Sequence, residues 1–149
     1  MEKIPTKFED VFVLRPKVFK DERGFFYESY SQKKMKSVGL DYEFVQDNHS
    51  KSQKGTVRGL HFCLYPGQVK LIRCTRGKIL DVIVDIRQNS PKFKQWESVI
   101  LSEENFKQIL IPIGFAHGFS VLSDEAEVQY KVSSHYDPEI ERGIIWNDP

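Results

Sequence analysis

Cations and imidazoles stand inside segments of this chain that otherwise have the composition of β-strands. Residues 57–62 contain Arg58 and His61, Lys70 opens the next apolar run, and His117 lies within residues 115–119. Removing such side chains from water is costly unless they are paired with other groups or used in chemistry. An imidazole can act as a base and an ammonium can stabilise a developing negative charge. We therefore expect the working site of the protein here.

The period-two alternation of a strand indicates which of these side chains point inward. Along residues 127–132, Tyr130 shares its face with two valines, whereas the opposite face is polar. His117 likewise shares its face with Phe115, Phe119 and Val121. Both side chains are therefore predicted to face the interior.

Strict alternation places Arg58 and His61 on opposite faces, although both have the character of site residues. Gly59 lies between them, and a β-bulge at this glycine would bring both to one side. Asp81 and Asp85 share a face with Ile79 and Ile83. Either that face is solvated, or the two carboxylates pair with interior cations.

Each residue also has an ordinary structural explanation. An inward histidine or tyrosine is usually a packed residue with its polar atom satisfied, and Lys70 could be a solvated lysine at a sheet edge. A base, an acid and a cation on one interior are harder to explain by packing alone. Their combination favours a catalytic interpretation.

Other functions are disfavoured by what the sequence lacks. His61 is followed by Phe62 and Cys63, without the closely spaced second histidine of a β-barrel metal site, so we expect no metal. There is no glycine-rich phosphate loop, nucleophile elbow or dinucleotide fingerprint. The 22 basic and 21 acidic residues give a net charge of +1, and no basic stripe with interleaved aromatics predicts a nucleic-acid partner.

Length and composition predict one domain over residues 1–149. No run approaches the roughly 18 apolar residues of a membrane span, and residues 1–5 have no signal-peptide character. We therefore expect a cytoplasmic protein without a membrane partner. The two cysteines, Cys63 and Cys74, are expected to be reduced thiols.

The elements expected from the sequence are almost all strands, which predicts an all-β fold. A turn at residues 21–24 and a turn at residues 76–77 separate neighbouring strands, and one helix is expected over residues 31–38, capped by Ser31 and ended by Gly39. The series of about nine strands is typical of a sandwich or barrel. The predicted strands cover residues 8–13, 24–30, 44–45, the region around Leu60, 69–74, 79–86, 96–101, 108–111, 114–122 and 127–132.

Eight segments, in order along the chain, resemble the dTDP-4-dehydrorhamnose 3,5-epimerases. They are DERGFFYES (21–29), VQDNHS (45–50), RGLHF (58–62), KLIR (70–73), IPIGFAHGF (111–119), SDEAE (123–127), YK (130–131) and WNDP (146–149). The resemblance implies a cupin-type jelly roll with one or two short helices and without metal or cofactor. It also implies a homodimer that acts on a nucleotide-linked 4-keto-6-deoxyhexose.

The resemblance further implies the residue roles. His61 matches the base, Lys70 the cation that stabilises the enolate oxygen, and Tyr130 the acid on the opposite face. Arg23 and Arg58 match arginines that contact the diphosphate. The remaining matches, which shape the nucleotide and sugar pocket, are Phe26, Glu28, Gln46, Asn48, Tyr136 and His117.

The sequence also departs from the family pattern. Family members continue beyond the position of Pro149 and carry in that tail an Asp that pairs with the base. The chain is thus expected to be a short member in which another group orients the His61 ring, and Asp81, Asp85, Asp148 or water are the candidates. In addition, Cys63 stands where family members commonly have Gln, and residues 64–67 form a nonstandard loop.

Three functions stay open on these grounds. The first is inversion at C3 and C5 of dTDP-4-dehydro-6-deoxy-D-glucose, which gives dTDP-4-dehydro-L-rhamnose. The second is a C3-only epimerase or a 4-ketoisomerase of a related sugar nucleotide. The third is a non-catalytic sugar-nucleotide-binding cupin or partner subunit.

Overall fold

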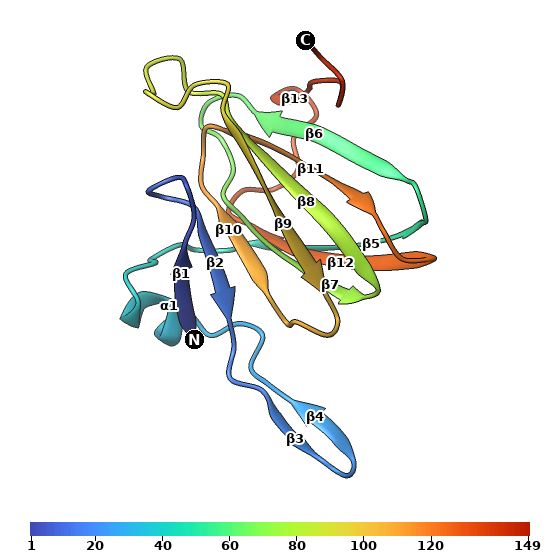
Figure 1. Ribbon diagram of the computed structural model, residues 1–149. Coiled ribbons are helices and arrows are strands. Elements are labelled where there is room, and N and C mark those ends of the chain that lie inside the picture. Colours follow the sequence, from blue (N-terminus) through green and yellow to red (C-terminus); the bar gives the residue numbers. More distant parts are fainter.

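Thirteen strands and one short helix make up the structure, a computed structural model that describes residues 1–149 (Figure 1). The all-β expectation with a short helix is confirmed. The elements are β1 (Glu2–Pro5), β2 (Phe12–Arg15), β3 (Phe19–Asp21), β4 (Gly24–Phe26), α1 (Gln32–Ser37), β5 (Gln46–Gln53), β6 (Val57–Cys63), β7 (Lys70–Arg76), β8 (Lys78–Asp85), β9 (Trp96–Ser102), β10 (Gln108–Ile111), β11 (Phe115–Val121), β12 (Glu125–Val132) and β13 (Glu141–Gly143).

The strands form two facing antiparallel sheets with the topology of a jelly roll. One sheet has the order β1-β2-β10-β7-β12-β5 and the other the order β13-β6-β11-β8-β9. From β5 to β12 every connection crosses between the sheets except that of the β8–β9 hairpin, which is the double Greek-key pattern that defines the jelly roll. Figure 1 shows β5, β7 and β12 crossing behind β6, β8 and β11. The cupin-type sandwich implied by the resemblance is confirmed.

Two apolar clusters hold the six-stranded sheet from both sides. Ile72 and Ile109 point into the main core between the sheets, together with Ile83 and Phe119 from the opposing sheet. Their neighbours along β7 and β10 point the other way, into a second cluster with Met35 of α1. Strands β7 and β10 are therefore buried on both faces, which explains their continuous apolar runs.

The helix forms where the sequence predicts it. The hydroxyl of Ser31 accepts a hydrogen bond from the Lys34 backbone N–H at 3.4 Å, which satisfies one of the free donors of the first turn. Gly39 follows the helix with φ +79°, a conformation that glycine adopts without strain. Met35 fixes the helix to the sheet because its side chain is fully buried in the second cluster.

The strand predictions were right for the apolar strands from β6 to β12. The strand expected over residues 8–13 lies instead at Phe12–Arg15 as β2, and the one expected over residues 24–30 ends at Phe26 as β4. The run that begins at Phe44 was expected to be a strand of two residues, whereas the strand is β5, over Gln46–Gln53. No strand was expected for β1, β3 or β13. The sequence of β5 is polar on both faces, because its inward face borders a cavity rather than the core. Apolar alternation is therefore missing at that strand.

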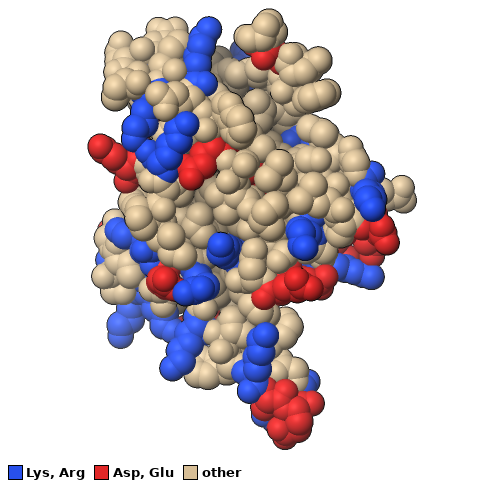
Figure 2. All heavy atoms as spheres, in the orientation of Figure 1, with Lys and Arg blue, Asp and Glu red and all other residues tan.

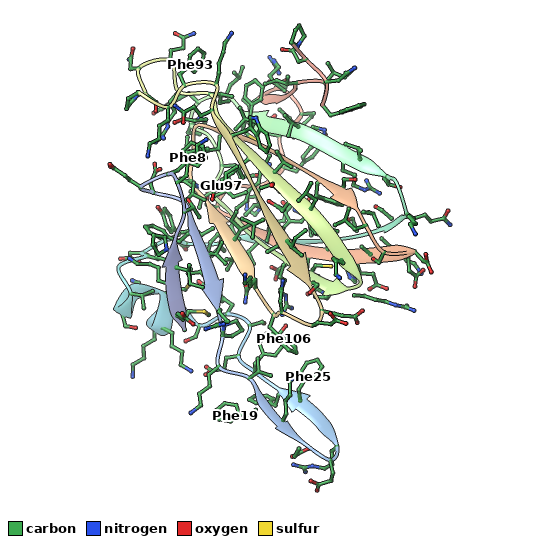
Figure 3. All side chains as sticks on the ribbon, viewed as in Figure 1. Phe8, Phe19, Phe25, Phe93, Glu97 and Phe106 are labelled. Atoms are coloured by element: carbon green, nitrogen blue, oxygen red, sulfur yellow. The ribbon has the colours of Figure 1, made fainter.

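A hairpin made by β3 and β4 projects from one end of the sandwich (Figure 1). The predicted turn at residues 21–24 is confirmed at its tip, where the Asp21 carboxylate accepts a hydrogen bond from the Arg23 backbone N–H at 2.9 Å. At its base the ring of Phe25 packs edge-on against Phe106, with centroids 5.0 Å apart (Figure 3). Phe19, Phe25 and Phe26 nevertheless all remain exposed. In Figure 2 charges of both signs are scattered over the body, and acidic atoms gather at the hairpin tip.

A buried ion pair closes the end of β8. The carboxylate of Asp85 has no exposed surface and accepts hydrogen bonds from Arg87 Nε at 2.9 Å, Arg87 Nη2 at 2.8 Å and Ser90 Oγ at 2.6 Å. Arg87 also donates to Asp10 at 2.6 Å and stacks over Phe115. Burial alone would raise the pKa of Asp85, but the hydrogen bonds from Arg87 and Ser90 outweigh it and lower the pKa to about 2. Asp85 was expected either to lie on a solvated face or to pair with an interior cation. The structure shows the second arrangement, with Arg87 as the cation.

We predict that Asp85→Asn lowers the free energy of unfolding at pH 7 by about 1–3 kcal/mol, because charge-assisted hydrogen bonds are lost. The pKa of Asp85 is lower in the folded state than the usual value of 3.8 for this side chain. Its stabilising effect is therefore present above about pH 4 and is lost as the pH falls toward 2. Urea unfolding of both proteins between pH 7 and pH 2 measures this. The exposed Asp124→Asn is the control, and a wild-type advantage that persists unchanged at pH 2 would contradict the prediction.

Candidate active site

A cavity of about 530 Å³ opens between the two sheets and is lined mainly by polar side chains. The six-stranded sheet contributes residues of β5, β7 and β12, and the five-stranded sheet contributes residues of β6, β11 and β13. The lining residues are Gln46, Asn48, Ser50, Val57, Arg58, Gly59, His61, Cys63, Gln68, Lys70, His117, Gly118, Phe119, Val128, Tyr130, Tyr136, Asp137 and Glu141. Eight of the eleven site residues expected from the sequence are among them.

A bulge in β6 brings Arg58 and His61 to the same side, as predicted. His61 pairs with His117 of β11, whereas Arg58 pairs with Phe119, so β6 uses three steps where β11 uses two. Gly59 lies in this irregularity with φ +101°. A Cβ atom there would lie 2.6 Å from both Gly118 Cα and the His117 carbonyl oxygen. The two backbones can approach this closely only because Gly59 has no side chain.

The three expected catalytic side chains reach the cavity from different sheets. His61 comes from β6 of the five-stranded sheet, whereas Lys70 and Tyr130 come from β7 and β12 of the six-stranded sheet. The imidazole therefore faces the ammonium and the phenol across the space between the sheets. A flat ring bound between them would meet His61 on one face and Tyr130 on the other.

The electrostatics of Lys70 and Tyr130 suit a cation and an acid. Burial lowers the pKa of Lys70, while the negative charges of Glu141 and Asp81 act in the opposite direction. The ammonium is in no ion pair within the chain. Burial raises the pKa of Tyr130, and the Glu141 carboxylate raises it further. The phenol therefore keeps its proton at neutral pH and can give it to a bound molecule.

Behind the cavity wall, His117 is bonded to a buried carboxylate. Its Nε2 lies 2.8 Å from Asp81 Oδ2, and the Asp81 side chain has no exposed surface. The other oxygen, Oδ1, has no hydrogen-bond partner. Asp81 thus fixes the ring of His117 while the ring borders the cavity. The sequence left open whether Asp81 lies on a solvated face or pairs with an interior side chain. The structure shows that it points inward and pairs with His117.

The partner of His61 differs from the candidates proposed from the sequence. Asp81 is engaged by His117 and Asp85 by Arg87, so neither contacts His61. The carboxylate beside His61 is Glu141, whose Oε1 lies 3.4 Å from His61 Nδ1. Sequence reasoning missed Glu141 because the three-residue strand β13 is too short to show a pattern.

Polar residues that are bonded to one another form the opposite wall. Gln46 Nε2 donates to Asn48 Oδ1 at 2.9 Å, and Gln46 Oε1 accepts from the backbone N–H of Tyr136 at 3.1 Å. Arg58 Nε donates to Ser52 Oγ at 2.7 Å and Arg58 Nη2 donates to the Lys51 carbonyl at 3.4 Å, which leaves Nη1 for an anion. Cys63 also lines the cavity, and burial raises the pKa of its thiol.

Three expected substrate-binding residues lie elsewhere in the chain. Arg23 is at the hairpin tip, bonded to Asp21, with 83% of its side chain exposed. Phe26 ends the same hairpin and is 68% exposed. Glu28 pairs with Lys34 of α1. None of the three lines the cavity of its own chain.

The residues give no sign of a metal centre. No group of three or more His, Cys, Asp or Glu side chains is close enough to hold an ion. His49 Nε2 lies 3.0 Å from Glu127 Oε2. No helix is long and apolar enough to cross a bilayer.

A jelly roll that holds a histidine opposite a lysine and a tyrosine around one cavity contains the groups that an isomerase acting by proton transfer needs. The family model for dTDP-4-dehydrorhamnose 3,5-epimerase matches residues 5–149. The chain is 57% identical over 150 residues to a dTDP-4-dehydrorhamnose 3,5-epimerase of Shigella flexneri, covering 99% of this chain and 83% of that protein.

Solved structures give the same result. The crystal structure of the dTDP-4-dehydrorhamnose 3,5-epimerase of Bacillus anthracis with TDP and PPi bound has a TM-score of 0.96 at 49% identity, covering 99% of this chain and 85% of that one. The 3,5-epimerase of Legionella pneumophila in complex with dTDP-4-keto-L-rhamnose has a TM-score of 0.96 at 48% identity, covering 99% and 79%. This chain belongs to the dTDP-4-dehydrorhamnose 3,5-epimerase family.

We predict that Gly59→Ala destabilises the fold by about 1–3 kcal/mol, because its Cβ has no space and its φ is unfavourable for alanine. Gly143→Ala is a matched control in the neighbouring strand, since a Cβ there meets Leu60 O at 3.6 Å and His61 Cδ2 at 3.7 Å, which are ordinary contacts. Urea unfolding measures the difference. Equal losses of stability in the two variants would refute the role given to the bulge.

Proposed function

We propose that this chain inverts C3 and C5 of dTDP-4-dehydro-6-deoxy-D-glucose and gives dTDP-4-dehydro-L-rhamnose, without a cofactor. The observation that carries the proposal is the placement of His61 on one sheet and of Lys70 and Tyr130 on the other, around one cavity. The relatives that share this fold include an epimerase bound to the proposed product.

The reaction depends on the ketone at C4. A hydrogen on a carbon beside a ketone is acidic only because the electron pair left behind spreads onto the carbonyl oxygen as an enolate. His61 removes the hydrogen as a proton, and the Lys70 ammonium stabilises the enolate oxygen. The lack of a competing ion pair leaves this ammonium available for that oxygen.

Inversion requires that the new proton arrive on the opposite face of the sugar. Tyr130 faces His61 across the cavity and keeps its phenolic proton, so it can give that proton to the carbon from the other side. The cycle leaves an imidazolium and a phenolate, which are restored by exchange with solvent. The same pair can act at C3 and then at C5 if the sugar shifts in the cavity.

The remaining polar residues would hold the nucleotide. The Nη1 group of Arg58 has no partner within the chain and suits the diphosphate, which a planar guanidinium can bind with two hydrogen bonds. Gln46, Asn48 and Tyr136 form the bonded wall beside it. His117, held by Asp81, would contact the substrate or support those that do.

The test is incubation with dTDP-4-keto-6-deoxyglucose in deuterated water. We expect deuterium at both C3 and C5, read by NMR. Label at C3 alone would support the C3-only epimerase instead, and no label would support a non-catalytic binding protein. His61→Asn should slow labelling by about 10² to 10⁴-fold, the usual contribution of a general base.

The control for that variant is His49→Asn. His49 is bonded to Glu127 and does not line the cavity, so labelling should continue at the wild-type rate. Equal loss in both variants would show that the His61 effect is not specific to the site.

We also propose that the chain works as a homodimer in which the β3–β4 hairpin of one copy completes the cavity of the other. The family resemblance assigns Arg23, Phe26 and Glu28 to the substrate pocket, yet no residue of the hairpin lines the cavity of its own chain. The exposed aromatic rings of Phe19 and Phe26 fit a surface that is covered in an assembly.

Mixing two inactive variants tests this arrangement. Arg23→Ala and His61→Asn should each be inactive as homodimers. A mixed dimer would contain one site with both native residues, so refolding the two variants together should recover about a quarter of wild-type activity. No recovery, in a mixture shown to be dimeric by light scattering, would contradict the exchange of hairpins.

A further inference from the structure

The guanidinium of Arg58 is held by a hydrogen bond that joins the two sheets. Its Nε donates to Ser52 Oγ at 2.7 Å, and its Nη2 donates more weakly to the Lys51 carbonyl at 3.4 Å. Ser52 belongs to β5 of the six-stranded sheet, whereas Arg58 belongs to β6 of the five-stranded sheet. The side chain of Arg58 thus reaches from one sheet to the other at the edge of the cavity and is fixed at its head group.

Ser52 is a fixed support for this bond. The residue is only 7% exposed, and its backbone pairs with the buried Ala126 of β12. The turn that follows Ser52 is bonded to the end of β11, since the Gly55 N–H donates to the Val121 carbonyl at 3.1 Å. The Val121 N–H donates in return to the Thr56 carbonyl at 3.0 Å. The hydroxyl of Ser52 is therefore held in place before any ligand binds.

The two bonds orient the charge of Arg58 without neutralising it. The basic neighbours Lys51 and Lys54 are each paired with a carboxylate, that of Glu125 and that of Asp124. The bonds of Arg58, in contrast, are to a hydroxyl and to a backbone carbonyl, which carry no net charge. A positive charge that is fixed in direction and not compensated suits the binding of an anion.

The bonds also determine which edge of the guanidinium is free. Nε and one N–H of Nη2 lie on the same edge of the planar group, and this edge of Arg58 is bonded to β5. The neighbouring edge carries Nη1 and the second N–H of Nη2. Two parallel N–H groups of this kind match two oxygens of a phosphate, so the free edge can bind a diphosphate at two points.

We propose that Ser52 is a positioning residue for the substrate diphosphate, an inference that rests on the proposed role of Arg58. The hydroxyl oxygen of Ser52 accepts the Nε hydrogen and holds the guanidinium in the orientation in which it binds. The conformational entropy of a long side chain is then lost when the protein folds, so binding does not have to supply it. Ser52 itself does not line the cavity, so it acts on the ligand only through Arg58.

The test measures the affinity for TDP, the nucleotide part of the proposed substrate, by calorimetric titration. In Ser52→Ala the ligand must order the freed arginine, so the Kd for TDP should rise about 2- to 10-fold. KM should rise by a similar factor with kcat changed by less than about 2-fold, because Arg58 does not act on the reacting carbons. Ser102→Ala is the matched control and should keep the wild-type Kd. Ser102 is also buried and accepts a hydrogen bond, from the Asn105 backbone N–H at 3.1 Å, but lies outside the cavity.

A double-mutant cycle distinguishes positioning of Arg58 from any other effect of Ser52. When Ser52→Ala is added to Arg58→Ala, the Kd for TDP, measured by NMR titration because binding is weaker, should not rise further. An equal rise in both backgrounds, an unchanged Kd in Ser52→Ala, or a fall in kcat alone would overturn the inference. A wild-type protein that binds TDP but labels neither carbon would refute the proposed inversion instead, and the cycle would still decide the role of Ser52. Failure of the wild type to bind TDP would refute both.

Discussion

The chemistry of this protein depends on placing charged and polar side chains inside a β-sandwich without losing the fold. The interior is divided in two. One part is a closed apolar core in which Ile72, Ile83 and Phe119 meet between the sheets. The other is the polar cavity, where the inward faces of β5, β6 and β12 carry hydrogen-bonding groups. The apolar part supplies the burial that stabilises the sandwich, so the cavity can keep an ammonium with no ion-pair partner.

Most of the site could be predicted from the sequence, because polar residues interrupt strands that are otherwise apolar. Alternation correctly predicted that Tyr130 and His117 point inward. Because strict alternation placed Arg58 and His61 on opposite faces, it also correctly predicted a bulge at Gly59. These inferences are local, since they need only the two-residue repeat of a strand. The resemblance to the epimerase family then supplied the roles, which remain proposals for this chain.

The sequence could not predict which side chains are bonded to one another inside the sandwich. Asp81 and Asp85 were recognised as inward candidates, but only the folded structure shows that His117 and Arg87 take them. Glu141 was missed because its position depends on how a three-residue strand pairs with β6, and nothing local specifies that pairing. The prediction at residues 44–45 also failed to include β5, over Gln46–Gln53, for a related reason. Its inward face lines the cavity and is polar, so the apolar signal of a strand is missing where the strand is most functional.

The burial of β7 on both faces has a consequence for motion in the site. Lys70 begins a strand whose next residues, Leu71 and Ile72, are packed into different clusters on opposite sides of the sheet. Sliding or tilting that strand would disturb both clusters at once, so the ammonium is attached to a rigid support. The side of the cavity that carries Lys70 is therefore expected to keep its geometry when a ligand enters or leaves.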